Sequence, residues 1–240
     1  MMSKPGFFRK TKGGDDSSED DTRLFLMREF FDGFYKVLWN LLKEFKEKKA
    51  TPCHGYSLAF SACNDREGAS TMALNFALAY AEASLQKVVL IDGNLRNPTL
   101  HGYFNVSRET GLTELLRSEK NVDQVLVEVE PSSFFFIPSG RSLQNPVVLY
   151  ESAAFELVLQ HLKDTFDVII FDSSPASRSP ETTVLASRMN GLIMVLEAES
   201  TRWEVARAAR DSLAGTGANI VGAILNKKRY VIPEIIYRLL

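Results

Sequence analysis

Short apolar runs and longer helical patterns alternate along most of the chain. The apolar runs have the length of strands and lie at 56–62, 88–92, 134–137, 168–172, 192–196 and 220–225. Apolar side chains at helical spacing occupy 71–84, 147–163, 183–188 and 202–214. Several runs are apolar on both faces of a strand. The alternation therefore predicts a three-layer α/β fold, in which helices cover both faces of a mostly parallel, twisted sheet.

The first part of the chain has a different pattern. Residues 1–21 combine a basic segment, a pair of glycines and an acidic run, with few side chains that a core could bury. This composition is typical of disorder, so we expect a disordered N-terminal tail over 1–21. Residues 22–48 carry apolar side chains at helical spacing, which predicts a leading helix. The chain of 240 residues favours one domain, which we assign to 22–240.

Composition and charge exclude several classes of protein. The formal net charge is −2, so we expect no nucleic-acid binding. The longest apolar runs are far shorter than the ~20 residues that a membrane span needs. Cys53 and Cys63 lack the spacing and the histidine partner of a zinc site, which favours free thiols in a reducing compartment. We therefore expect a cytoplasmic protein.

The stretch SACNDREGASTMALNFALAY, residues 61–80, connects a predicted strand to an alanine-rich predicted helix. A phosphate-binding loop, G-x-x-x-x-G-K-[ST], lies at this kind of junction, where its backbone N–H groups and its lysine hold phosphates. Gly68, Ser70 and Thr71 match that loop, whereas Ala69 stands in place of the lysine. The sequence thus has the scaffold of a nucleotide site without its usual cation.

Two acids follow buried strands at corresponding places. KVVLIDGNLR leads into Asp92, and FDVIIFDSSP leads into Asp172. Ligands of such sheets bind at the carboxyl ends of the strands, where P-loop proteins hold Mg²⁺ through a serine hydroxyl, waters and a carboxylate. Ser70, Asp92 and Asp172 are therefore the candidate metal ligands, and we expect them to lie together. The alternative is that the two acids only cap the turns that follow.

The order of these and further motifs resembles the cytoplasmic kinase domain of bacterial tyrosine autokinases, or BY-kinases. These are MinD-like P-loop proteins of capsule and exopolysaccharide synthesis, and the resemblance runs from about Asp32 to the C-terminus. The motifs that carry it are EGAST (67–71), IDGNLRNPTLH (91–101), GLTELL (111–116), IPSG (137–140), NP (145–146), FDVIIFDSSP (166–175), TRWEV (201–205) and VGAILN (221–226). The resemblance implies a vestigial nucleotide pocket built from Gly68, Ser70, Thr71, Arg96 and Asn226, with Asn226 facing the adenine.

Several positions depart from the pattern of active members of that family. Arg66 stands where the family has a loop glycine, and we expect its Cβ to disturb the shape of the loop. Ala69 replaces the lysine that reaches the β- and γ-phosphates, and Asn94 replaces the second acid of a D-x-D motif. Asp92 and Asp172 would then persist only as remnants of a catalytic site.

The family's devices for ring assembly and autophosphorylation are missing as well. Its E-x-x-R-x-x-R ring motif corresponds to Asp32, Tyr35 and Leu38, so neither arginine is present. The sequence also has no tyrosine-rich tail, and self-association would have to use another route. We therefore expect a pseudokinase with no catalytic residues and no bound cofactor. By resemblance it docks on the cytoplasmic tail of a membrane polysaccharide co-polymerase and is peripheral at the inner face of the cell membrane.

Two alternatives remain open at this point. One is an active tyrosine kinase or ATPase that uses ATP and Mg²⁺, with Arg66 as a substitute cation in a divergent phosphate loop. The other is a MinD-like ATPase at the membrane surface, since residues 229–240 carry apolar side chains at helical spacing. Ala69 is the residue that favours the pseudokinase over the active kinase, because a transferring phosphoryl group needs an oriented cation.

Overall fold

The computed structural model describes residues 55–84, 86–129, 133–143 and 145–228. The predicted tail over 1–21, the predicted leading helix over 22–48 and the C-terminal residues 229–240 lie outside the described residues. The positions that correspond to the ring motif lie outside them too. The phosphate loop and both strand-end acids are within the described part.

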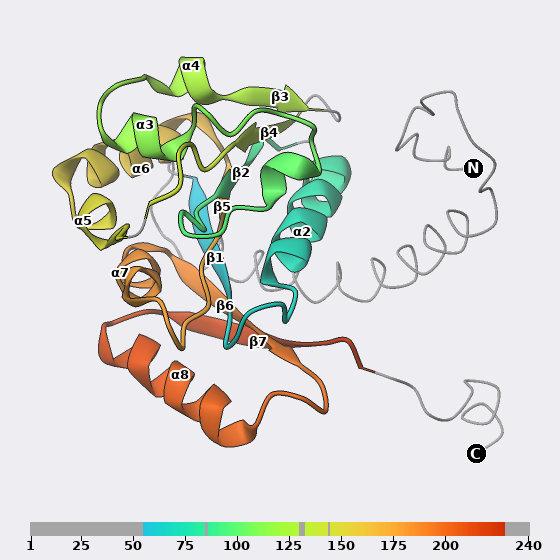
Figure 1. Cartoon of the computed structure of the whole chain (residues 1–240). Coiled ribbons are helices and arrows are strands. Elements are labelled where there is room, and N and C mark those ends of the chain that lie inside the picture. The colour runs from blue at the N-terminus through green and yellow to red at the C-terminus, as the bar shows by residue number, and fades with distance from the viewer. Residues whose placement is uncertain (1–54, 85, 130–132, 144, 229–240) are drawn as a thin grey trace, which may run out of the picture. The chain divides into compact units, whose positions relative to one another are not determined.

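In the described part of the chain, seven strands form one sheet in the order β3-β4-β2-β5-β1-β6-β7 (Figure 1). The strands are β1 (Tyr56–Ala62), β2 (Val88–Asp92), β3 (Val127–Val129), β4 (Phe134–Ile137), β5 (Val168–Asp172), β6 (Gly191–Glu197) and β7 (Ile220–Asn226). Neighbouring strands are parallel except for the pair β3 and β4, which is antiparallel. The predicted mostly parallel sheet is thus confirmed. Only the short edge strand β3 was not predicted, since its three residues are partly exposed and form no apolar run.

The helices follow the strands in chain order. They are α2 (Ala69–Ser84), η1 (Leu100–Gly102), α3 (Leu112–Leu116), α4 (Val122–Val125), α5 (Val147–Tyr150), α6 (Ala153–Thr165), α7 (Pro180–Arg188) and α8 (Trp203–Gly215). The single helix that the spacing predicts over 147–163 is wrong, because the structure has α5 and α6 there. Pro146 precedes the first, and the Ser152 side chain accepts a hydrogen bond from the backbone N–H of Phe155 at the start of the second.

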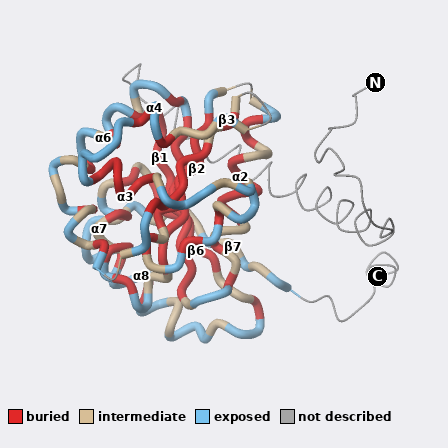
Figure 2. The backbone as a smooth tube through the Cα atoms, turned by 45° about the horizontal axis from the view of Figure 1, so that its top comes forward, coloured by how far each residue is buried: buried red, intermediate tan, exposed pale blue. Residues whose placement is uncertain are grey.

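Helices cover both faces of the sheet, as predicted (Figure 1). Helix α2 packs on one face, where the rings of Phe60 and Phe76 lie 5.6 Å apart between centroids. On the other face a continuous apolar cluster joins sheet residues such as Ile169 to side chains of α6, α7 and α8. The central strands are therefore buried on both sides (Figure 2), which explains their unbroken apolar runs. Among the described helices, none has the length and apolar character of a membrane span.

The parallel register brings the polar strand ends to one edge. Asp92 is directly opposite Asp172 in the pairing of β2 with β5, and Phe60 is opposite Asp172 in the pairing of β1 with β5. The loop that leaves β1 therefore starts beside both acids. This edge is where the candidate site lies.

Candidate functional site

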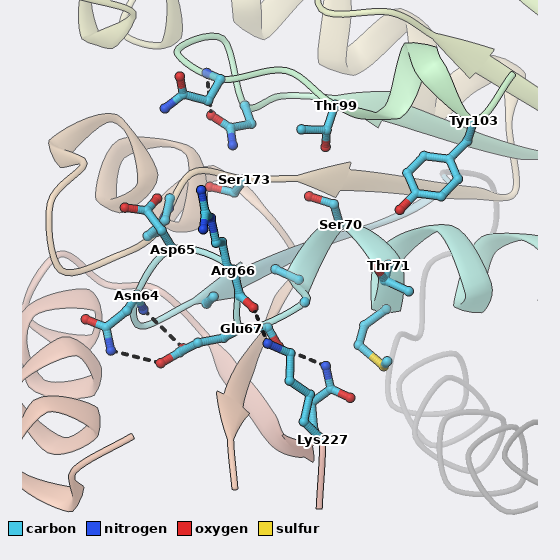
Figure 3. Close-up of a pocket in the computed structure, with 18 residues that line it drawn as sticks. Asn64, Asp65, Arg66, Glu67, Ser70, Thr71, Thr99, Tyr103, Ser173 and Lys227 are labelled. Atoms are coloured by element: carbon cyan, nitrogen blue, oxygen red, sulfur yellow. Dashed lines mark hydrogen bonds between the residues drawn. The ribbon is translucent and has the colours of Figure 1, made fainter. Parts of the chain in front are cut away.

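A cavity of about 1020 Å³ opens at the carboxyl edge of the sheet (Figure 3). That volume is at the upper end of the range for small-molecule pockets, roughly 300–1,000 Å³. Its walls come from the phosphate loop with the first turn of α2, from the segment after β2, from the segment after β5 and from the end of β7. Four segments far apart in the sequence therefore enclose one site, as expected for the ligand position of a parallel sheet.

The two strand-end acids lie together next to this cavity. Asp92 and Asp172 are both fully buried, and their neighbours Asn94 and Ser173 line the cavity. One oxygen of Asp92, Oδ2, accepts a hydrogen bond from the backbone N–H of Leu100 at 3.0 Å. Within the described residues, the other oxygen of Asp92 and both oxygens of Asp172 have no hydrogen bond partner. The capping alternative thus accounts for one oxygen of Asp92. At Asp172 the Ser173 backbone N–H and the Ser70 hydroxyl are close enough to lower the pKa, but neither makes a hydrogen bond of good geometry.

Burial governs the protonation of the pair. It raises the pKa of Asp92 to about 7, although the hydrogen bond from Leu100, the nearby backbone N–H groups of Asn94 and Thr99, and the charge of Arg108 act in the opposite direction. Burial also raises the pKa of Asp172 well above its usual range, and the charge of Asp92 raises it further. Two buried carboxyl groups at paired positions of neighbouring strands do not both ionise readily. The pair therefore retains a proton near neutral pH.

The donor set fits a hard divalent cation. Ser70 lies close enough to Asp172 to lower the pKa of that carboxyl, but its hydroxyl makes no hydrogen bond of good geometry to either oxygen. Carboxylate and hydroxyl oxygens are the ligands that Mg²⁺ prefers, and the unpartnered oxygens of Asp172 could face such an ion. The described residues contain no cluster of three or more His, Cys, Asp or Glu side chains suited to a metal. Water and ligand oxygens would therefore have to complete the coordination.

The phosphate loop keeps an ordered shape. Gly68 has a φ of 98°, and a Cβ at this position would lie 2.3 Å from Nδ2 of Asn226. Arg66 has a φ of 63°, which is the left-handed region that glycine enters without strain. The expectation that arginine disturbs the loop is therefore wrong for the backbone at residue 66. Its Cβ is accommodated, at a cost of about 1–2 kcal/mol for the left-handed conformation.

The cation of the usual loop is absent from the first turn of α2. Ala69 begins that helix and is buried, with 7% of its surface exposed. Two cationic side chains line the cavity from other directions: Arg66 extends from the loop toward Ser173, and Lys227 reaches the loop from the end of β7 (Figure 3). The amine of Lys227 is already engaged, because it donates to the backbone carbonyl of Arg66 at 2.6 Å.

Comparison with known proteins decides the family. A family model described as an AAA domain matches residues 62–203. The chain is 27% identical over 208 residues to the tyrosine-protein kinase CpsD of Streptococcus agalactiae, covering 86% of this chain and 87% of that protein. It is 31% identical over 169 residues to the tyrosine-protein kinase YwqD of Bacillus subtilis strain 168, covering 70% of each. The chain belongs to the BY-kinase family.

The fold of this BY-kinase-like domain agrees with that placement. It superposes on the kinase domain of the Escherichia coli tyrosine kinase ETK with a TM-score of 0.69 and 26% identity, covering 74% of this chain and 70% of that one. The predicted three-layer P-loop fold is confirmed by the sheet order and by this likeness. The family takes part in capsule and exopolysaccharide synthesis. The resemblance to BY-kinases that the motifs indicated is therefore confirmed for the family.

The structure brings most, but not all, of the predicted pocket residues of this BY-kinase-like domain together. Gly68, Ser70, Thr71 and Asn226 line the cavity. Arg96 does not, because its guanidinium forms two hydrogen bonds to the buried carboxylate of Glu181 at the start of α7. That buried partner, which the sequence did not reveal, directs Arg96 away from the cavity.

Asn94 lines the cavity as a neutral, engaged side chain. Its Oδ1 accepts hydrogen bonds from the Ser174 hydroxyl at 2.8 Å and from the backbone N–H of Asn97 at 3.2 Å. The amide oxygen is therefore used within the protein, and the position has no negative charge to offer a metal. In this respect the site differs from the acid pair that the motif of active BY-kinases contains.

Lys227 and Tyr103 are among the wall residues that were missed from the sequence. Lys227 follows the predicted Asn226 directly, so the same strand end could have indicated it. Tyr103 points toward the start of α2 and has 58% of its surface exposed (Figure 3). It directly follows η1, whose first residue, Leu100, donates a backbone hydrogen bond to Asp92. No local signal at Tyr103 could have predicted its place in the wall.

Proposed function

We propose that this chain is a catalytically inactive BY-kinase-like protein that regulates exopolysaccharide or capsule synthesis or export by binding. The observation that carries the proposal is Ala69 at the start of α2, which leaves the first turn of the phosphate-loop helix without a cation. Oriented cations stabilise the charge of a transferring phosphoryl group, and losing one such group costs roughly 10²–10³ in rate. A site that has lost this group retains the fold of the kinase without its main electrostatic contribution.

The acidic half of the site supports the same conclusion. Asn94 carries no charge, and its oxygen is already hydrogen-bonded to Ser174 and Asn97. Asp92 and Asp172 hold a proton near neutral pH because both are buried and close together. A Mg²⁺ ion would have to release that proton before it could bind both carboxylates. We therefore propose that no cofactor is needed for the function of this protein.

Docking gives the inactive domain its role. From the resemblance to BY-kinases we propose that the domain binds the cytoplasmic tail of a membrane polysaccharide co-polymerase. The protein would then be cytoplasmic and held at the inner face of the cell membrane by that partner. Self-association would proceed through surfaces other than the ring motif of active members, since Tyr35 and Leu38 replace its arginines.

Phosphotransfer and docking are tested separately. Incubation of the full chain with Mg-ATP, followed by intact mass measurement, should give no phosphate addition, and release of inorganic phosphate should not exceed that of the Asp172→Asn variant. A phosphorylated tyrosine in wild type, absent from Asp172→Asn, would refute the inactive assignment. Binding to the cytoplasmic tail of a co-polymerase from the same organism should occur without nucleotide. No binding in the presence or absence of Mg-ATP would refute the docking role.

An active kinase or ATPase is the second candidate, and one observation favours it. Arg66 adopts the left-handed backbone of a loop glycine and extends its side chain over the cavity toward Ser173 (Figure 3). A guanidinium in that place could substitute for the missing lysine, with ATP and Mg²⁺ as cofactors. If phosphate release is detected in wild type, Arg66→Ala should abolish it while Arg178→Ala, an exposed arginine paired with Asp65, should not.

A further inference from the structure

Three segments meet beside the cavity and are joined by polar contacts. They are the phosphate loop over 63–68, the turn over 197–201 between β6 and α8, and the end of β7. At their centre is the carboxylate of Glu67, which has only 3% of its surface exposed. It accepts hydrogen bonds from the backbone N–H groups of Cys63 and Asn64 at 2.9 and 3.0 Å and from the Asn64 side-chain amide at 2.8 Å. Glu67 therefore closes the loop on itself.

A fourth hydrogen bond to Glu67 comes from outside the loop. The Thr201 hydroxyl donates to Oε1 of Glu67 at 2.6 Å and accepts from the backbone N–H of Glu197 at 3.0 Å. The backbone N–H of Thr201 also donates to the carbonyl of Glu197 at 3.0 Å. A hydroxyl has one proton to donate, and here it is directed to Glu67. The turn before α8 thus holds the loop through a single, well-defined contact.

A second link runs through the end of β7. Nζ of Lys227 donates to the carbonyl oxygen of Arg66 at 2.6 Å and lies 3.2 Å from Oε2 of Glu197. The Asn226 amide donates to the carbonyl of Glu67 at 2.8 Å, and the carbonyl of Asn226 accepts from the backbone N–H of Ala198. The loop and the turn are therefore connected twice, once directly and once through β7.

The same three segments hold unusual backbone conformations. Of the five residues other than glycine with positive φ in the described part, three belong to these segments: Arg66 at 63°, Glu199 at 61° and Lys227 at 55°. Left-handed conformations are disfavoured for residues with a Cβ and persist only where surrounding contacts fix them. The hydrogen bonds of Glu67, Thr201 and Lys227 are contacts of that kind.

We infer that Thr201 and Lys227 are positioning residues for the phosphate loop, and that the state of the loop is coupled to the start of α8. The turn that holds Thr201 leads directly into Trp203, the first residue of that helix, whose side chain is 64% exposed. The guanidinium of Arg207 lies 5.8 Å from the centre of the Trp203 ring. A change in the conformation of the loop would alter the position of Trp203 through the hydrogen bond of Thr201 to Glu67. A partner that contacts Trp203 would alter the loop through the same hydrogen bond.

The inference goes beyond the proposed function because it assigns a mechanical link and no catalytic step. Its test uses no nucleotide, so a positive or negative phosphotransfer result leaves it standing. The perturbation is Thr201→Val, which keeps the shape of the side chain and removes the hydroxyl. The matched control is Thr201→Ser, which keeps the hydroxyl and removes a methyl group.

Amide hydrogen exchange of the full chain measures the state of the loop. Thr201→Val should speed exchange at the backbone N–H groups of Cys63 and Asn64 by roughly tenfold, the size expected for losing one hydrogen bond to a carboxylate. Thr201→Ser should stay within about twofold of wild type, since the bond to Glu67 can re-form. Lys227→Met should speed exchange over 66–68 in the same way. Equal exchange in the Val and Ser variants, or unchanged exchange in Thr201→Val, would overturn the inference.

The effect of the loop on the start of α8 is measured through the fluorescence of Trp203. In a Trp39→Phe background Trp203 is the single tryptophan, because the chain contains two. A Glu67→Ala variant, which removes the acceptor of the Thr201 hydroxyl, should shift the emission of Trp203. Combining it with Thr201→Val should add little further shift, because the hydroxyl has already lost this partner. Additive shifts would mean that the two residues act independently and would refute the coupling. If Glu67→Ala does not fold, the exchange comparison of the two Thr201 variants decides alone.

Discussion

Replacing Asp92 with asparagine should stabilise the folded protein at alkaline pH and remove the part of the pH dependence that Asp92 creates. The side chain is fully buried, and its pKa is raised from 3.8 to about 7, mainly by burial. The folded state therefore binds more protons than the unfolded state between those two values. Stability due to this group is greatest at acidic pH and is lost as the pH rises toward 7.

The size of the effect on the free energy of unfolding follows from the rise in the pKa of Asp92. One pKa unit corresponds to about 1.4 kcal/mol, so a rise of about three units costs about 4 kcal/mol once Asp92 is ionised. Between pH 5 and pH 8 the wild-type free energy of unfolding should fall by about 3 kcal/mol through this group. Asparagine keeps the oxygen that accepts from Leu100 and adds an N–H that can donate to Asp172. The variant also lowers the pKa of Asp172, because the charge of Asp92 is one of the causes that raise it.

Urea unfolding followed by circular dichroism at pH 5, 6, 7 and 8 measures the effect. The difference in unfolding free energy between Asp92→Asn and wild type should grow in favour of the variant as the pH rises. Asp123→Asn, a change at an exposed acid, serves as the control and should show no such trend. If the wild type and Asp92→Asn keep parallel pH profiles, Asp92 does not titrate in this range and the reasoning from its burial fails.

Two further changes test the loop. Gly68→Ala should destabilise the protein by about 2 kcal/mol or more in the same unfolding assay, because of its φ of 98° and the Asn226 amide 2.3 Å from the new Cβ. Gly217→Ala is the control, since its φ is 83° with no atom within 4 Å, and it should cost about 1–2 kcal/mol. Ala69→Lys should tighten binding of Mg-ATP by about 1–3 kcal/mol in calorimetry. It should create no turnover, because Asn94 stays neutral; phosphate release by that single variant would contradict this.

The sequence was sufficient for the architecture and for the position of the acids. Apolar runs of strand length end at Asp92 and Asp172, and parallel pairing must bring such ends to one edge, so their meeting could be predicted without coordinates. The same periodicity could not predict β3, which pairs at the rim with partly exposed residues. It also joined α5 and α6, since the break at Ser152 lies inside an apolar pattern that continues on both sides.

Side-chain partners were beyond the reach of sequence patterns. Arg96 was assigned to the pocket from its motif, but its partner is Glu181, a buried acid 85 positions further along the chain. Arg66 was expected to disturb the loop, yet the left-handed φ is held by contacts from Lys227, 161 positions away. Both outcomes depend on tertiary neighbours that compete with local preference. The predicted features outside the described residues, among them the tail over 1–21, stay predictions.

The loop between β1 and α2 is held in shape without a lysine at position 69. In an occupied loop the backbone N–H groups and the lysine both face phosphate, so the lysine contributes to the ligand more than to the fold. Here the loop is fixed from within by Glu67, which accepts from Cys63, Asn64 and Thr201. None of these contacts involves position 69, where a buried alanine packs at the start of α2. The contacts that shape the loop therefore do not depend on a cation at position 69. A scaffold stabilised in this way can persist as a binding module independently of phosphotransfer.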